Sequence, residues 1–111
     1  MSDPKADLLK GTLDLLILKA LTLGPQHGYG IARWIEESSR DLLQIEEGSL
    51  YPALSRMHKR GWIRSEWGYS DSNRKAKYYH LTTVGREQLE SQAHGWERLV
   101  EAMSSVLEQR A

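Results

Sequence analysis

At 111 residues, with 40% hydrophobic and 27% charged residues, the chain can bury one modest core and is too apolar for wholesale disorder. It contains no cysteine, which excludes a disulfide framework and thiolate metal sites. The polar N-terminus lacks the apolar centre of a signal peptide, and the longest apolar run, Leu15 to Leu18, is too short to cross a bilayer. We therefore expect a cytoplasmic protein that does not enter a membrane.

The net charge is zero, but the charges are unevenly distributed along the chain. Residues 48–80 carry seven basic and two acidic side chains, whereas residues 36–47 carry one basic and five acidic ones. A basic surface confined to one part of a fold can attract nucleic acid whatever the total charge. The segment from 48 to 80 is therefore where a negatively charged partner is expected to bind.

The first predicted element is a helix from Leu8 to Leu23, which has strong helix formers and no glycine or proline after Gly11. Its apolar residues are too numerous for the single stripe of about 100° that one core requires. The helix is therefore either enclosed within its own domain or in contact with a second subunit. We favour the second option for so short a chain. The expected interface residues of this helix are Leu9, Leu13 and Leu16.

A turn rich in glycine and proline, residues 24–28, precedes a second helix with Ile31, Trp34 and Ile35 on its apolar face. Tyr29 lies at the start of this helix, where free backbone amides and the helix dipole can bind a phosphate. The alternative is a plain turn with Tyr29 packed inside.

A polar connector, Asp41 to Glu47, has room for a single short strand. Ser49 is then the predicted N-cap of a third helix, in which Pro52 is tolerated in the first turn and Gly61 marks the end. One apolar stripe of this helix is expected to be buried. The stripe consists of Leu50, Leu54 and Met57.

The opposite face of the third helix is polar and basic. A helix that enters a major groove needs short polar groups near its start and longer cations further along, and this face supplies both. The alternative is an ordinary solvated helix face. The residues of the face are Ser49, Tyr51, Pro52, Ser55, Arg56 and Lys59.

Two segments with alternating side chains, Trp62 to Gly68 and Ala76 to Leu81, predict a β-hairpin with a polar tip. A basic tip can lie along the DNA backbone or enter the minor groove. Alternatively, it is a charged turn that keeps the protein soluble and discourages edge pairing. The basic residues concerned are Arg74, Lys75 and Lys77.

The pattern is helical again from Thr82 onward, with Thr82 or Thr83 as the N-cap. Apolar residues recur at spacings of four and three, which predicts a heptad seam and hence a dimer. Trp96 lies at the centre of the seam, where it either packs the interface or contacts a ligand in an opening between the subunits. The seam residues are Leu89, Ala93, Trp96, Val100, Met103 and Leu107.

This order of elements predicts a mainly α fold with a small β-hairpin, namely a winged helix-turn-helix with flanking N- and C-terminal dimerisation helices. We assign residues 1–82 to the DNA-binding domain, including the N-terminal helix, and residues 83–111 to the C-terminal dimerisation helix. The four histidines are scattered and no catalytic motif is present. We therefore expect no metal site, no cofactor and no enzymatic activity.

Residues 47–54 read Glu-Gly-Ser-Leu-Tyr-Pro-Ala-Leu, and residues 77–82 read Lys-Tyr-Tyr-His-Leu-Thr. Together with residues 13–18, 27–31 and 61–63 and with Gly85, these strings closely resemble the PadR family of bacterial transcriptional regulators. The resemblance runs from about Leu9 to Leu107, and the single C-terminal helix is similar to that of the smaller subgroup of the family.

The resemblance implies a homodimer built from the first and last helices, with two winged heads on a pseudo-palindromic operator in double-stranded DNA. It also implies repression relieved by a small hydrophobic or aromatic effector. Ser49, Tyr51 and Pro52 would open the recognition helix, and Tyr29 matches a glycine-flanked tyrosine at the second helix. Trp96 is similar to an interface tryptophan that stacks planar ligands. The basic wing would consist of Arg74, Lys75 and Lys77.

The expected function is therefore that of a sequence-specific DNA-binding transcriptional regulator, a homodimeric repressor that a small molecule releases from its operator. The alternative is a winged-helix module for protein assembly that does not bind DNA. In that case its basic surface would bind acidic partners.

Overall fold

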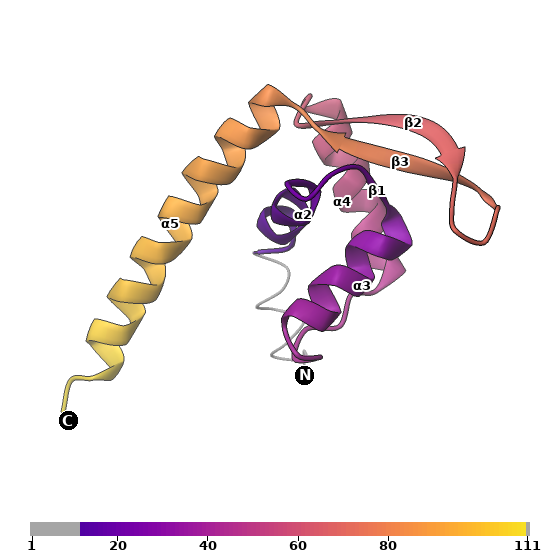
Figure 1. Ribbon diagram of the computed structural model, residues 1–111. Coiled ribbons are helices and arrows are strands. Elements are labelled where there is room, and N and C mark those ends of the chain that lie inside the picture. Colours follow the sequence, from indigo (N-terminus) through magenta and orange to yellow (C-terminus); the bar gives the residue numbers. More distant parts are fainter. Residues whose placement is uncertain (1–11, 111) are drawn as a thin grey trace.

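The computed structural model describes residues 12–110, so Leu9 and the first predicted turn of the N-terminal helix lie outside the described residues. Within these residues, a head of three helices and a three-stranded sheet is followed by one long helix that extends away from it (Figure 1). This arrangement confirms the predicted mainly helical, winged helix-turn-helix fold. The elements are α2 (Leu13–Leu21), β1 (Gln26–His27), α3 (Gly28–Ser38), α4 (Glu47–Lys59), β2 (Ile63–Tyr69), β3 (Lys75–Leu81) and α5 (Thr83–Leu107).

Helix α2 lies in the middle of the head, where it contacts α3, α4 and α5. Ile17 and Leu18 have no exposed surface, Leu13 is only 5% exposed, and Leu16 packs against the core from its edge. Burial of these side chains is the main source of stability for the head. Most of the apolar residues of this helix are thus accounted for inside its own chain, although Leu16 is only partly buried. The expected contact of this helix with a second subunit stays a prediction.

The recognition helix predicted from Ser49 begins two residues earlier, at Glu47. Ser49 is not its N-cap, because the N–H of Ser49 already bonds to the carbonyl of Glu46 at 3.0 Å, within the first helical turn. The predicted buried stripe is confirmed, since each of its three side chains is at most 1% exposed. Those side chains are Leu50, Leu54 and Met57.

No strand forms in the connector between α3 and α4, where a short one was expected. Leu43 and Ile45 instead pack against the core, and the Ile45 N–H donates to a Glu36 carboxylate oxygen at 2.9 Å. The short strand occurs earlier, as β1, in the segment that was predicted to be a turn. It pairs with β3, with Gln26 opposite Tyr79, and so gives the sheet the order β1-β3-β2.

The start of α5 is joined tightly to the end of α4 and the start of β2. Of the two predicted N-cap residues, Thr82 is the one that caps the helix, because its Oγ1 accepts the Gly85 N–H at 3.0 Å. The same hydroxyl lies 2.9 Å from the carbonyl oxygen of Trp62, to which it can donate. Gly85 is buried against that carbonyl group, and a side chain at this position would collide with it. Only glycine fits this junction without moving the backbone.

Replacing Gly85 by alanine is therefore expected to lower the free energy of unfolding by about 1–3 kcal/mol, the usual cost of overpacking a close contact. Gly95→Ala is the matched control in the same helix, since a Cβ there meets nothing within 4 Å. The control should be neutral or up to about 1 kcal/mol more stable, because alanine favours helix over glycine. Chemical denaturation followed by circular dichroism measures both. Equal stabilities for the two variants would contradict this account of the junction.

Helix α5 leaves the head after its first turns. Its 25 residues correspond to a length of about 38 Å. They give the chain dimensions of 57 × 30 × 23 Å and a radius of gyration of 15.6 Å, against about 13 Å for a compact domain of this size. Within residues 12–110, no helix is long and apolar enough to span a membrane.

Candidate nucleic-acid interface

A hollow of about 620 Å³ lies where α4, the start of α3 and the hairpin β2–β3 meet. Five aromatic or imidazole rings line it, together with three cationic side chains and one carboxylate. We call the hairpin the wing and this hollow the wing groove. Its charged and aromatic lining consists of His27, Tyr29, Tyr51, Trp67, Asp71, Arg74, Lys75, Lys77 and Tyr79.

Helix α4 forms one wall of the wing groove, and its amphipathic pattern determines which of its side chains are exposed. The buried stripe faces the core, so Pro52, Ser55 and Lys59 lie on the opposite, exposed face. Tyr51 lies on the side of the helix that faces α3 and is 46% exposed. A Cβ at Gly28 would come within 2.8 Å of its hydroxyl oxygen, so glycine at this position lets the phenol pack closely. The close contact fixes the position of Tyr51 at the edge of the groove.

Arg56 lies on the flank of α4 that faces α2. Its Nη2 is 3.0 Å from the Asp14 carboxylate, while its own side chain remains 51% exposed. The aspartate balances its charge locally, so Arg56 contributes less to the basic surface than its sequence suggests. Ser49 is exposed at the start of α4, away from the groove lining.

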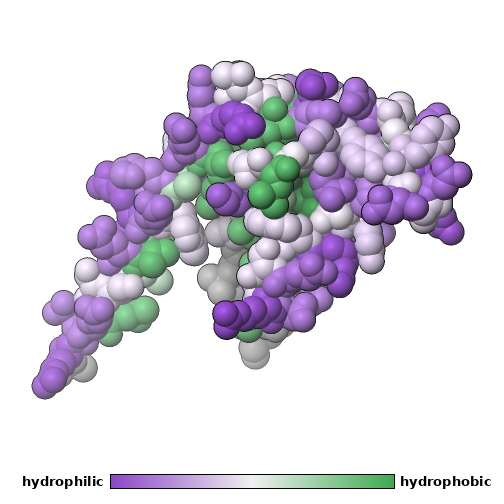
Figure 2. Space-filling view, viewed as in Figure 1, coloured by the Kyte–Doolittle hydropathy of each residue, from purple (hydrophilic) through white to green (hydrophobic). Residues whose placement is uncertain are grey.

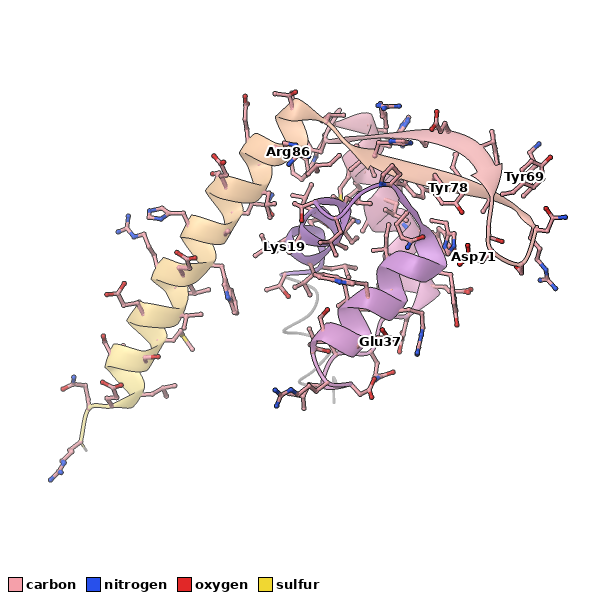
Figure 3. All side chains as sticks on the ribbon, viewed as in Figure 1. Lys19, Glu37, Tyr69, Asp71, Tyr78 and Arg86 are labelled. Carbon is pink, nitrogen blue, oxygen red and sulfur yellow. The ribbon has the colours of Figure 1, made fainter. Side chains whose placement is uncertain are left out.

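The start of α3 is capped by a side chain that sequence analysis missed. The Nδ1 of His27 accepts the backbone N–H of Gly30 at 2.9 Å, which satisfies one of the free donors of the first turn. Tyr29 is 70% exposed beside this cap, so the alternative in which it packs inside is wrong. The acidic Glu37 lies at the other end of α3, far from the wing (Figure 3).

The wing has two faces of different character. Trp67 is directly opposite Lys77 in the register of β2 and β3, and Tyr69 is opposite Lys75, so all four share the inner face. On the outer face, Glu66 pairs with His80 at 3.0 Å. Glu66, the acidic side chain of the strands, is thus turned away from the wing groove together with Arg64, whereas Lys75 and Lys77 are turned toward it.

The tip of the wing is a tight turn that carries Arg74. The Ser70 N–H donates to the Arg74 carbonyl at 2.8 Å, and the Asn73 N–H donates to the Ser70 carbonyl at 2.8 Å. Asn73 adopts a positive φ of 60°, a conformation that asparagine tolerates better than most residues. Tyr78 fixes the same end, because its hydroxyl donates to the Tyr69 carbonyl at 2.9 Å (Figure 3).

Tyr79 forms the floor of the groove and is 8% exposed. Burial, and to a smaller extent the neighbouring Tyr51, raises the pKa of the Tyr79 hydroxyl above its usual value. The hydroxyl therefore stays protonated and neutral over the range in which proteins function. It adds no negative charge to a surface that would face phosphate groups.

The structure thus brings five of the predicted DNA-binding residues together at one groove and leaves four outside its lining. Those in the groove are Tyr29, Tyr51, Arg74, Lys75 and Lys77. Those outside are Ser49, Pro52 and Lys59 on the exposed side of α4 and Arg56 on its flank. Trp67 was not predicted as a site residue. Its alternation with Ile63 placed it on the inner face, but only the strand register shows that it meets the lysines.

The predicted seam residues of α5 divide into two groups. Leu89 packs against the core of the head and Ala93 is half-buried. Beyond them Trp96 and Val100 are each 42% exposed, and Met103 and Leu107 are more exposed still. Figure 2 shows hydrophobic groups along the side of α5 that is turned toward the head, with polar groups on the other side. The part of the seam from Trp96 onward is thus not buried by other side chains of residues 12–110.

Among residues 12–110, no group of histidine, aspartate or glutamate side chains is arranged to hold a metal ion.

Comparison with known proteins indicates the family of the chain. Residues 17–91 match the model of the transcriptional regulator PadR-like family. The structure is similar to a transcriptional regulator from Clostridium thermocellum, with a TM-score of 0.81 and 29% identity over 89% of this chain and 96% of that one.

Two further relatives extend the comparison. A PadR-like transcriptional regulator from Bacillus cereus is 31% identical, with a TM-score of 0.79, over 94% of this chain and 99% of that one. A protein of Lysinibacillus sphaericus called "Uncharacterized protein X" is 28% identical over 104 residues, which are 94% of this chain and 95% of its own length. The similarity to each of these proteins therefore covers the head and much of the long helix.

Proposed function

Because this chain belongs to the transcriptional regulator PadR-like family, we propose that it is a homodimeric repressor that a small molecule releases from a pseudo-palindromic operator. Membership makes it a DNA-binding transcriptional regulator and not an enzyme. The repressor role, the dimer and the effector are the proposal. The observation that carries the DNA-binding function is the wing groove, where cations and aromatic rings from three separate elements converge.

In the proposed complex, α4 enters the major groove, whose width of about 12 Å matches the diameter of a helix. Its exposed face presents Ser55 and Pro52 to the base edges and Lys59 further along. The wing then follows the backbone or reaches the adjacent minor groove with the cations of its inner face and tip. Tyr29 and the free amides of α3 approach a phosphate on the near side.

The dimer is proposed to form through α5. A helix of this length with an apolar stripe is stable in water only when the stripe is covered, and a second copy of the helix is the simplest cover. The exposed groups at and beyond Trp96 support this proposal. The division of the chain after residue 82 remains a prediction. Leu89, in the first part of α5, packs against the head, so the two predicted parts are in contact.

The effector is proposed to bind beside Trp96, whose indole ring is 42% exposed at the centre of the seam. A planar aromatic molecule could stack on this ring between two subunits and change their separation. In a variant with phenylalanine at the other three tryptophan positions, we expect an effector to quench the remaining emission and to weaken operator binding. If the molecule quenches the emission of Trp96 but leaves the DNA affinity unchanged, it binds at this site without regulating DNA binding, which would contradict the proposed effector role.

The experiment that tests the function is a mobility-shift titration with DNA from upstream of the chain's own gene. We expect sequence-dependent binding at nanomolar to micromolar protein that weakens steeply as salt is added. A scrambled fragment of equal length is the control. Absence of DNA binding, with capture of acidic proteins in its place, would overturn the proposal and favour a winged-helix module for protein assembly.

A further inference from the structure

Trp67 stands on the inner face of the wing with little protein around it. Its side chain is 63% exposed, so both faces of the ring are open to neighbouring side chains and to a ligand. The Lys75 ammonium nitrogen lies 5.1 Å from the centre of its ring, and that of Lys77 lies 5.7 Å from it. Both distances are within the range of about 6 Å over which an aromatic face attracts a cation.

Lys75 reaches the tryptophan ring from a position that is not directly opposite it. Lys77 is directly opposite Trp67, but Lys75 is opposite Tyr69 and reaches Trp67 only along the diagonal of the strand pair. Its ammonium group nevertheless lies over the indole ring, the strongest of the aromatic cation acceptors. Both charges are thereby gathered at one point of the groove wall.

Neither lysine has a competing partner in the part of the chain that the structure describes, where no ion pair involves them. An exposed lysine without a partner samples many rotamers, and that freedom is lost when it binds a phosphate. A ring that already restricts both side chains reduces this loss. An ammonium group has three N–H donors, so contact with the ring leaves donors available for phosphate oxygens.

We propose that Trp67 is a positioning residue for DNA binding, which holds the ammonium groups of Lys75 and Lys77 at the wing groove ready to meet backbone phosphates. This inference rests on the proposed function. It makes the affinity of the wing depend on an aromatic ring as well as on the number of its charges. Trp67 itself need not touch the DNA.

Trp67→Leu and Trp67→Phe test the proposal as a matched pair, because leucine removes the π face and phenylalanine keeps one. We expect Trp67→Leu to weaken operator binding about three- to tenfold and Trp67→Phe to stay within about twofold of the wild type. The slope of log affinity against log salt should be unchanged in both, because the number of neutralised phosphates is the same. Melting temperatures should be close to that of the wild type because the side chain is exposed.

The decisive experiment introduces Trp67→Leu into a variant that already carries Lys75→Gln and Lys77→Gln. In this variant the two ammonium groups that Trp67 is proposed to position are absent. We expect no further loss there. An equal loss in both backgrounds would overturn the proposal and indicate that the ring contacts DNA directly. No loss in the wild-type background would overturn it as well. If Trp67→Leu does not fold, Trp67→Gln replaces it.

Different experimental results would contradict the proposed function and the proposed role of Trp67. If the wild-type protein does not bind operator DNA, or if the two lysine substitutions leave binding unchanged, the function or the wing's part in it is wrong. If the lysine substitutions weaken binding and Trp67→Leu does not, only the role of the tryptophan is wrong.

Discussion

Replacing Arg74, Lys75 and Lys77 together by alanine is expected to lower the affinity for operator DNA on the order of a hundredfold to a thousandfold at about 0.1 M salt. These three cations lie at or beside the wing groove on exposed positions, where a phosphate backbone can reach them. Each lost phosphate contact reduces the slope of log affinity against log salt by about 0.9. A dimer carries two wings, so the slope should fall by about five in total.

The loss should be similar for operator and unrelated DNA, since contacts to the backbone carry no sequence information. Fluorescence anisotropy over a series of salt concentrations measures affinity and slope together. The matched control removes three cations elsewhere, namely Lys19, Arg86 and Arg110, of which Lys19 and Arg86 lie away from the wing (Figure 3). An equal loss in the control would show that total charge, rather than the wing groove, governs binding.

Introducing aspartate at Val100 and Met103 is expected to convert the protein to monomers. Two carboxylates per chain, placed where a second copy should pack, would lose their hydration on association without gaining a partner. The dimer dissociation constant should rise by more than about a thousandfold, which corresponds to roughly 4 kcal/mol or more. Sedimentation velocity gives the oligomeric state. Operator affinity should fall with it, because two half-sites would no longer be bound together.

A control for this substitution places aspartate at His94 and Ser105, which a helical projection puts on the opposite side of α5. The charge change resembles that of the test variant, but the seam is left intact. The control should remain a dimer and bind DNA. A dimer that persists with aspartate at Val100 and Met103 would show that the seam lies elsewhere.

Hydrophobic periodicity was sufficient to predict most of the elements in the described residues. The stripe of Leu50, Leu54 and Met57 is buried as expected, and the alternation on either side of residues 70–74 gives the wing. These signals are local, because a helix or hairpin repeats its buried positions within a few residues. The turn before α3 was less predictable, since β1 forms there only because β3 offers a partner.

The parts of the candidate site that could not be predicted depend on pairings between distant residues. Arg56 had the appearance of a free cation, and its partner Asp14 lies 42 residues away. Trp67 and its two lysines come from different strands, and their meeting depends on the register of the hairpin. A one-residue shift in that register would place the tryptophan and the cations on opposite faces.

The buried glycine at the junction of α5 also has a geometric consequence for an operator. Because Gly85 lets the helix press against the Trp62 carbonyl, the angle between head and helix is set by backbone contact and not by a flexible linker. In a dimer joined along α5, that angle determines how far apart the two recognition helices stand. Successive major grooves on one side of DNA are about 34–36 Å apart. In such a dimer, a tilt of about 10° at the seam would move the end of a 25-residue helix by about 6–7 Å. That displacement would prevent the two recognition helices from entering successive major grooves together.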